Sequence, residues 1–326
     1  MNSIAFCGSL IVDEIKMVSS WPEKGMLVPI SSLSRAVGGS VCNSGIDLKT
    51  LDQSVVVKAF GKVGADDKGD FVVKTLSEHG LDVSGVARAK DVPTTFTDVV
   101  TVESSGERTF FNMHGADSAL TPDDIEPEAL GCDLFHFGYI LLLDGMDAPD
   151  DEYGTKAARL LAKVQAAGIK TSVDIVSEQS ERFARVVRPA LRYCDYAIIN
   201  EIEGSLATGV DKSDLRGICE GLFDLGVKER VAVHCPDVGV SLGKGGDWAS
   251  VPSLALPEGW IRGSVGAGDA FCAGMLYAIM KGMAPDESLR LASCAAACNL
   301  AAPDSISGAR SLAETMELDR RFSRRA

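Results

Sequence analysis

The run Gly266-Ala267-Gly268-Asp269 stands just before an apolar stretch that predicts a helix over residues 271–280. Glycines at such a point let backbone N–H groups converge on an anion, and the helix dipole adds positive potential there. A phosphate would repel an acid beside it, so Asp269 makes chemical sense if it takes a proton from an attacking hydroxyl. The pattern favours phosphoryl transfer. The alternative is a glycine-rich turn in which Asp269 only caps the helix.

Further groups of residues could position a substrate or a nucleotide. Each has a structural explanation when taken alone, as a turn residue or a helix cap. Their combination is more informative, because an unrelated α/β protein has no reason to place them all in this order. In chain order they are Asp13, Gly38-Gly39-Ser40-Val41-Cys42-Asn43, Gly61-Lys62-Val63-Gly64-Ala65-Asp66-Asp67-Lys68-Gly69, Asn200-Glu201-Ile202-Glu203 and the run at residues 266–271.

This ordered set resembles the motifs of the PfkB/ribokinase family of carbohydrate kinases, and it covers most of the chain. The resemblance implies that Asp269 is the catalytic base and that the backbone amides of Gly266, Ala267 and Gly268 form an anion hole for the transferred phosphoryl group. It also implies an α/β fold, a ribokinase-like three-layer αβα sandwich with a mostly parallel central sheet and a small β lid, in one domain over residues 1–326.

The resemblance places the acceptor substrate beside Asp13, Gly39 and Asn43, whose counterparts in the family contact sugar hydroxyls. Arg108, in the expected lid, could contact the substrate or lie in solvent. A carboxylate suits the hydroxyls of a neutral polyol and would repel a substrate phosphate. We therefore expect the γ-phosphate of ATP to be transferred to a non-phosphorylated sugar or sugar-like molecule.

Two other functions stay open. The pair Asn43-Ser44 is similar to that of adenosine-kinase-like members, so a nucleoside is the alternative substrate, with Phe96 and Phe111 as walls around its base. A sugar- or nucleotide-binding regulator that has lost catalysis is a third hypothesis. The intact Asp269 argues against it.

On the nucleotide side, the resemblance implies ATP and Mg²⁺. Asn200 and Glu203 match the family's NxxE motif, in which the acid acts on Mg²⁺ through water. Another segment of the C-terminal half, residues 231–239, is expected to contact the nucleotide. The expected nucleotide-binding residues are Asn200, Glu203, His234, Gly239, Gly266 and Gly268.

Three departures from the family pattern bear on function. Gly263 replaces an acid that usually supports the anion-hole loop and a nearby monovalent-cation site, which leaves potassium dependence open. Pro236 stands in a segment that commonly reads Thr-x-Gly and has no backbone N–H, so His234 could reach the phosphates instead. The expected strand end at Asp174 carries Val176 where an Asn is often found.

The elements that must position these residues follow from apolar patterning. Buried strands that alternate with helices predict a mostly parallel sheet covered on both faces. We expect strands at 4–7, 55–60, 133–137, 169–174, 196–199 and 231–234, and helices at 41–51, 68–79 and 153–167.

Two segments, residues 12–35 and residues 94–113, do not follow this alternation of strands and helices. The second contains a predicted hairpin turn at 104–106. Parts of both segments form the expected lid. The alternating pattern gives the lid one apolar face, which predicts a homodimer joined through it.

Composition excludes some partners and locations. The formal net charge is -14, so the average field repels nucleic acid. No apolar stretch reaches the roughly 18 residues that span a bilayer, and no signal-peptide pattern is present. The nine cysteines form no CxxC pair and mostly lie in apolar runs. We therefore expect free thiols in a reducing compartment, the cytoplasm.

Overall fold

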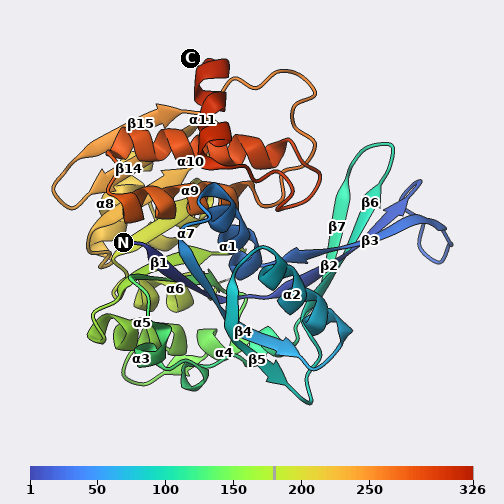
Figure 1. Ribbon diagram of the computed structural model, residues 1–326, viewed down its shortest axis with the longest axis horizontal. Helices are drawn as coiled ribbons and strands as arrows, with labels where there is room; N and C mark the ends of the chain where they lie inside the picture. Colours follow the sequence, from blue (N-terminus) through green and yellow to red (C-terminus); the bar gives the residue numbers. More distant parts are fainter. Residues whose placement is uncertain (179–180, 326) are drawn as a thin grey trace.

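The computed structural model describes residues 1–178 and 181–325. The main body has three layers, a nine-stranded sheet with helices on both faces, and a separate four-stranded sheet projects from it (Figure 1). The expected three-layer α/β architecture is therefore confirmed. In the described part of the chain, no helix is long and apolar enough to cross a membrane.

The central sheet is parallel over most of its width. Its order is β15-β14-β13-β12-β11-β8-β1-β4-β5, and β14 and β15 are antiparallel to their neighbours. The first strand of the chain therefore lies inside the sheet. The strands are β1 (Ser3–Gly8), β4 (Val56–Gly64), β5 (Asp82–Ala89), β8 (Leu134–Ile140), β11 (Lys170–Ile175), β12 (Tyr196–Asn200), β13 (Arg230–His234), β14 (Val238–Gly243) and β15 (Trp248–Pro252).

Helices form the two outer layers. One layer contains α1 (Ser40–Leu51), α2 (Asp67–Glu78), α9 (Ala267–Lys281) and α10 (Pro285–Leu300). The other contains α5 (Lys156–Ala166), α6 (Phe183–Leu191), α7 (Glu201–Thr208) and α8 (Leu215–Asp224). The remaining described elements of the body are η1 (Ala116–Ala119), η2 (Pro122–Asp124), α3 (Pro127–Leu130), α4 (Asp144–Asp147), β9 (Pro149–Asp150), β10 (Gly154–Thr155) and α11 (Leu312–Arg321).

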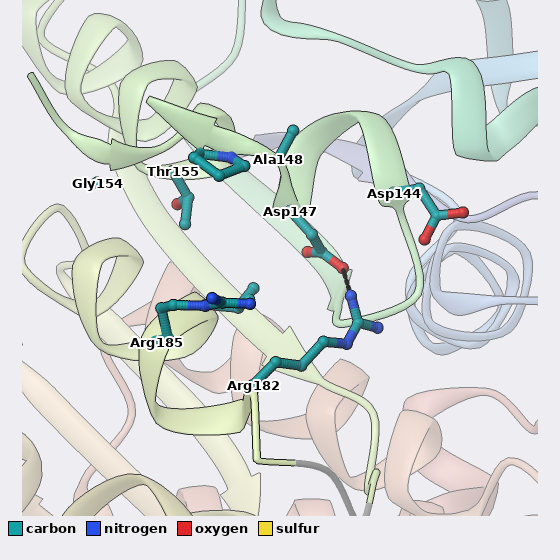
Figure 2. A pocket seen from close by; sticks show the side chains of 9 residues that line it. Asp144, Asp147, Ala148, Gly154, Thr155, Arg182 and Arg185 are labelled. Carbon is teal, nitrogen blue, oxygen red and sulfur yellow. Dashed lines mark ion pairs between the residues drawn. The ribbon is translucent and has the colours of Figure 1, made fainter. Parts of the chain in front are cut away.

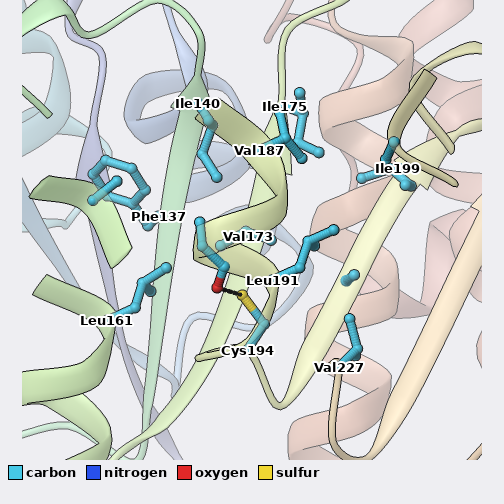
Figure 3. Close-up of a cluster of buried hydrophobic side chains, with 14 of the residues drawn as sticks. Phe137, Ile140, Leu161, Val173, Ile175, Val187, Leu191, Cys194, Ile199 and Val227 are labelled. Carbon is cyan, nitrogen blue, oxygen red and sulfur yellow. Dashed lines mark hydrogen bonds between the residues drawn. The ribbon is translucent and has the colours of Figure 1, made fainter. Parts of the chain in front are cut away.

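The core has two halves because the central strands are buried on both faces. In β8, Leu134 packs toward the layer of α1 and α9, whereas Phe135 and Phe137 pack toward α5 and α6. Figure 3 shows part of the second half, where Phe137 lies among aliphatic side chains from the neighbouring strand and helices. Each fully buried large apolar side chain contributes roughly 1.5–3 kcal/mol relative to an exposed one. This burial explains why the strands read as continuous apolar runs.

The four-stranded sheet has the order β3-β2-β6-β7. β2 pairs antiparallel with β3 and parallel with β6, so chain segments on either side of α1, β4, α2 and β5 meet in it. Large apolar side chains remain exposed on this sheet and on the loop between β2 and β3. Its strands are β2 (Ile11–Val18), β3 (Ile30–Gly38), β6 (Phe96–Val102) and β7 (Arg108–Met113).

Local differences from the expected elements have simple causes. The helix expected from residue 153 begins only at Lys156, because Gly154 and Thr155 pair with β9. Thr155 then caps α5 by accepting a hydrogen bond from the Ala158 N–H at 3.2 Å. The edge strand β5 was not expected from the sequence, since it lacks a continuous apolar run.

The segment at residues 61–69 has a structural role. Asp66 caps α2 by accepting a hydrogen bond from the Gly69 N–H at 2.8 Å. It also accepts hydrogen bonds from the backbone N–H and the hydroxyl of Thr94, at 2.8 and 2.6 Å. Burial acts to raise the pKa of Asp66, but the hydrogen bonds from Thr94 and Gly69 outweigh it and lower the pKa. Asp66 thus ties α2 to the chain that enters β6.

We expect Asp66→Ala to lower the free energy of unfolding by about 1–2 kcal/mol at pH 7, because it removes the cap and leaves Thr94 without its acceptor. Since the folded-state pKa is lowered, the contribution of Asp66 is present above the unfolded pKa and is lost as the pH falls through the folded value. Urea unfolding at pH 7 and near pH 3 measures both effects. Asp67→Ala is the control, because that carboxylate is exposed. Equal losses in the two variants would contradict this role.

Candidate active site

The predicted functional residues meet where α9 begins. Gly266 precedes the helix with a left-handed φ of 82°, and a Cβ there would lie 2.8 Å from the backbone of Ser305. No side chain in the described residues caps this helix. The Ala267 N–H donates to the Ser264 carbonyl oxygen at 3.4 Å, while the N–H groups of Gly268 and Asp269 remain available to a ligand. A helix N-terminus of this kind favours an anion.

Asp269 lies in the first turn of α9 and is buried. The Asn43 amide donates to its Oδ2 at 3.0 Å, and the Tyr139 hydroxyl donates to its Oδ1 at 2.5 Å. The Ser44 hydroxyl donates to the backbone oxygen of Asp269 at 3.3 Å and lies 3.5 Å from Oδ1. The structure thus brings Asn43 and Asp269, from two different motifs, into direct contact.

Opposing effects set the acidity of Asp269. Burial raises its pKa, while the hydrogen bonds from Tyr139, Asn43 and Ser44 act in the other direction, and the net pKa is above the usual value. A base works best when its pKa approaches the working pH. The environment of Asp269 therefore suits proton transfer.

Asp13, Gly38 and Gly39 form a second part of the predicted site. Asp13 belongs to β2, and a Cβ on Gly38 would lie 2.8 Å from its Oδ2. Gly39 has a φ of 87°, and a Cβ there would lie 2.4 Å from the Ser9 carbonyl oxygen. Burial raises the pKa of Asp13 to about 6, and the charge of Arg108 acts to lower it. Gly38 therefore permits close approach to the partly buried Asp13, and Gly39 permits close approach to the Ser9 backbone.

Arg108, the first residue of β7, reaches across to the main body. Its Nη2 donates to the carbonyl oxygen of Pro303 at 2.8 Å. Asp13, Arg108 and Ser305 line the same small cavity, which has a volume of about 30 Å³. Arg108 therefore links the four-stranded sheet to the segment that packs against Gly266.

A larger cavity of about 460 Å³ opens beside the N-terminus of α9. Apolar side chains form much of its wall, and a few polar groups interrupt them, which is typical of small-molecule sites. Gly266 is not among its lining residues. Of the residues predicted to form the anion hole or to bind the nucleotide, those that line it are Asn200, His234, Gly239, Ala267 and Gly268.

His234 ends β13 and packs against Phe271 of α9, with the ring centroids 4.6 Å apart. A Cβ on Gly268 would lie 3.6 Å from its Cε1, so the ring lies beside the start of α9. Burial lowers the pKa of His234 to about 4. The imidazole is therefore neutral at pH 7 and can offer a hydrogen bond there, but no positive charge.

Glu203 and Asn200 form a hydrogen-bonded group after β12. Asn200 caps α7, and Glu203 accepts hydrogen bonds from the Asn200 N–H at 3.0 Å and from the Ser177 hydroxyl at 2.7 Å. Burial raises the pKa of Glu203 to about 7. Burial, followed by the charges of Glu203 and Asp269, raises the pKa of Asp174 well above its usual value. A carboxylate such as that of Glu203 is the kind of oxygen ligand that a hard divalent cation such as Mg²⁺ prefers.

Sequence reasoning missed Tyr139 and Ser177. Tyr139 lies near the end of β8 and Ser177 lies just beyond β11, and neither belongs to a motif with recognisable spacing. In the folded chain the Tyr139 hydroxyl contacts Asp269 and the Ser177 hydroxyl contacts Glu203. These contacts become visible only in the tertiary structure.

A separate surface pocket of about 240 Å³ lies near α4 and α6 (Figure 2). Asp147 and Arg182 face one another in it, with Asp147 Oδ2 3.5 Å from Arg182 Nη1. None of the predicted site residues lines this pocket. It is therefore not part of the candidate active site.

We expect Tyr139→Phe to raise the pKa of Asp269 further, because the variant loses a hydrogen bond that favours the ionised carboxylate. Titration of ¹³C-labelled aspartate carboxyls by NMR measures this pKa, and Asp269→Asn identifies the resonance. Tyr196→Phe is the control, since the Tyr196 hydroxyl donates to Glu229 instead. An unchanged pKa in Tyr139→Phe would show that this hydrogen bond does not form in solution.

Comparisons with known proteins show the family and the fold of the chain. Residues 1–311 match the family model described as pfkB family carbohydrate kinase. The chain is 24% identical over 301 residues to 2-dehydro-3-deoxygluconokinase of Bacillus subtilis, an alignment that covers 88% of this chain and 87% of the relative.

Solved structures share the fold. Arabidopsis thaliana ribokinase complexed with ribose and ATP superposes with a TM-score of 0.81 at 19% identity, over 97% of this chain and 98% of the other. A putative ribokinase II from E. coli, in complex with ATP and Mg²⁺, superposes with a TM-score of 0.79 at 17% identity, over 98% of this chain and 100% of the other. With a family model that spans nearly the whole sequence, the chain belongs to the pfkB family of carbohydrate kinases.

Proposed function

We propose that this carbohydrate kinase transfers the γ-phosphate of ATP to a hydroxyl of a non-phosphorylated sugar or sugar-like substrate, with Asp269 as the base. One observation carries the proposal. A buried carboxylate lies in the first turn of an uncapped helix whose start lines a cavity of about 460 Å³. An acid so close to a phosphate site costs electrostatic energy unless it acts on the proton of the acceptor.

In the proposed reaction, the acceptor hydroxyl gives its proton to Asp269 as its oxygen bonds to the γ-phosphorus. The bond from that phosphorus to the bridging oxygen breaks, and ADP leaves. Asn43 and Tyr139 hold the carboxylate in one orientation. The N–H groups at Gly266, Ala267 and Gly268 would stabilise the charge on the transferred phosphoryl group.

Glu203 and Asn200 would hold Mg²⁺ through water. When bound, Mg²⁺ neutralises charge on the phosphates. The fit rests on the Glu203 carboxylate, which is buried and whose printed hydrogen bonds come from uncharged donors, the Asn200 N–H and the Ser177 hydroxyl. Gly263 offers no carboxylate, so the proposal includes no monovalent cation.

Sugar is favoured over nucleoside because Phe96 and Phe111, the suggested walls around a base, already have other partners. The cavity beside Asp13 is about 30 Å³ while Arg108 contacts Pro303, which is too small for a sugar or a nucleoside, so the four-stranded sheet would have to move before either binds there. Phe96 and Phe111 each contact a side chain of this protein. The Lys68 ammonium lies 5.0 Å from the Phe96 ring centroid, and Phe111 stacks on Trp21 at 6.3 Å.

The test is ATP consumption against a panel of free sugars, polyols, sugar phosphates and nucleosides. We expect turnover with at least one non-phosphorylated sugar or polyol. Turnover confined to nucleosides or to sugar phosphates would contradict the substrate class. Nucleotide binding without turnover on any member would favour the regulator hypothesis.

We expect Asp269→Asn to lower turnover on the best panel substrate by at least about 10²-fold, the low end of general-base effects. The amide keeps the size of the side chain and leaves the backbone N–H groups at the start of α9 in place, so folding and ATP binding should persist. Calorimetry of ATP binding and steady-state turnover measure the two properties. Asp211→Asn, an exposed acid beyond the C-terminus of α7, controls for the lost charge. If Asp269→Asn keeps more than about a tenth of wild-type turnover, another group is the base.

The four-stranded sheet is proposed to act as a lid and as a dimer interface. Leu27 is 89% exposed and Leu33 is 64% exposed, and Trp21 and Phe110 are exposed beside the same strands. Contiguous exposed apolar side chains commonly mark association sites. Opening of the lid would break contacts to the main body such as the Arg108–Pro303 hydrogen bond and the Arg35–Asp67 ion pair.

We expect Leu33→Glu to convert a dimer into a monomer at micromolar concentration, because it places a charge in the apolar interface. Sedimentation velocity measures the change. Val56→Glu is the control, since Val56 is an exposed apolar residue on the main body. A wild-type protein that sediments as a monomer would rule out this interface.

A further inference from the structure

Three buried side chains of metal-ligand type meet beneath the catalytic residues and take no part in the proposed mechanism. They are His136 of β8, Asp174 near the end of β11 and Cys272 of α9. One ligand atom from each lies within 4.8 Å of the other two. Three separate elements supply these residues, so the packing of α9 on the sheet brings them together.

The geometry allows one ion to bind between them. His136 Nε2 lies 3.9 Å from Cys272 Sγ. Zinc–nitrogen and zinc–sulfur bonds of about 2.0 and 2.3 Å together exceed that separation. An ion can therefore bond to both atoms at normal length from a point beside the line that joins them, with an angle somewhat wider than tetrahedral.

The surroundings resemble those of a metal-bound imidazole. The other ring nitrogen of His136, Nδ1, lies 3.2 Å from the Ser172 hydroxyl oxygen, which can accept its proton and fix the ring orientation. Metal-bound histidines usually have such an outer partner. Asp174 is the most exposed of the three ligands, at 8%, so an ion would enter from its side.

We propose that His136, Asp174 and Cys272 form a binding site for a soft divalent transition metal, with zinc as the favoured ion. Imidazole, thiolate and carboxylate are the ligands that zinc takes in proteins. Magnesium prefers oxygen ligands and has little affinity for a thiolate, so this site is separate from the one proposed at Glu203.

Charge balance supports the assignment. Burial lowers the pKa of His136 to about 3, so its imidazole is neutral and ready to bind. Burial, then the charges of Asp174, Asp269 and Glu203, raises the pKa of the Cys272 thiol. Binding must displace the thiol proton to solvent, and the zinc, thiolate and carboxylate charges then sum to zero. Affinity should rise with pH, because each bound ion releases a proton.

The experiment uses the full chain without nucleotide and with millimolar Mg²⁺ to occupy oxygen-only sites. Co²⁺ is titrated while absorbance is followed, and Zn²⁺ is then added to displace it. We expect one equivalent of Co²⁺ to give the sulfur-to-metal charge-transfer band and the intense visible bands of a tetrahedral thiolate site. Zn²⁺ should abolish both.

Two variants test the ligands. Cys272→Ala should lose the charge-transfer band and bind zinc at least about tenfold more weakly. The matched control is Cys194→Ala. Cys194 is an equally buried thiol, and its sulfur donates to the Ala190 carbonyl oxygen at 3.1 Å (Figure 3). If Cys272→Ala fails to fold, Asp174→Asn replaces it and should also weaken zinc binding at least about tenfold.

Three results would overturn the proposal: no thiolate band in the wild type, a band that persists in Cys272→Ala, or an equal loss in Cys194→Ala. The first would mean that Cys272 and His136 form only an S–H···N hydrogen bond. None of these readouts depends on kinase activity.

Discussion

The hydrogen bond from Asn43 to Asp269 joins residues 226 positions apart and sets where the Asp269 carboxylate lies. It requires α1 and α9 to lie side by side with their starts at the same end of the sheet. Each helix is preceded by a glycine at positive φ, Gly39 and Gly266, and a side chain at either position would collide with neighbouring backbone. The site therefore depends on two close backbone approaches as much as on its polar side chains.

Several acids share this end of the sheet, and the protein offsets their repulsion only in part. The pKa values of Asp13, Asp174, Glu203 and Asp269 are all raised, chiefly by burial. Uncharged donors such as Asn43 and Ser177 orient these groups without neutralising them. The unliganded site therefore binds protons more tightly than free carboxyl groups do, and a bound cation would compete with those protons. Ligand binding and proton release are coupled in such a site.

The sequence predicted much of the fold because buried parallel strands read as continuous apolar runs, as in β1 and β8. The edge strand β5 has mixed burial and escaped notice for that reason. Asp13, Asn43, Glu203 and Asp269 could be singled out because their motifs have fixed spacing. Tyr139 could not, since its contact with Asp269 arises only when β8 packs beside α9. His136 and Cys272 lie in apolar runs and look like ordinary core residues until the tertiary structure places them together.

The order of strands has a consequence for synthesis on the ribosome. β1 is made first; β4 and β5 complete one side of it, and β8, β11, β12, β13, β14 and β15 then join the other side one after another. Elongation adds roughly 5–20 residues per second, so each strand waits for seconds as an unpaired edge. Such an edge can pair with strands of other chains. Each new strand covers the previous edge and becomes the new unpaired edge of the sheet. α9 follows β15, so a nascent chain completes its sheet before it acquires Asp269.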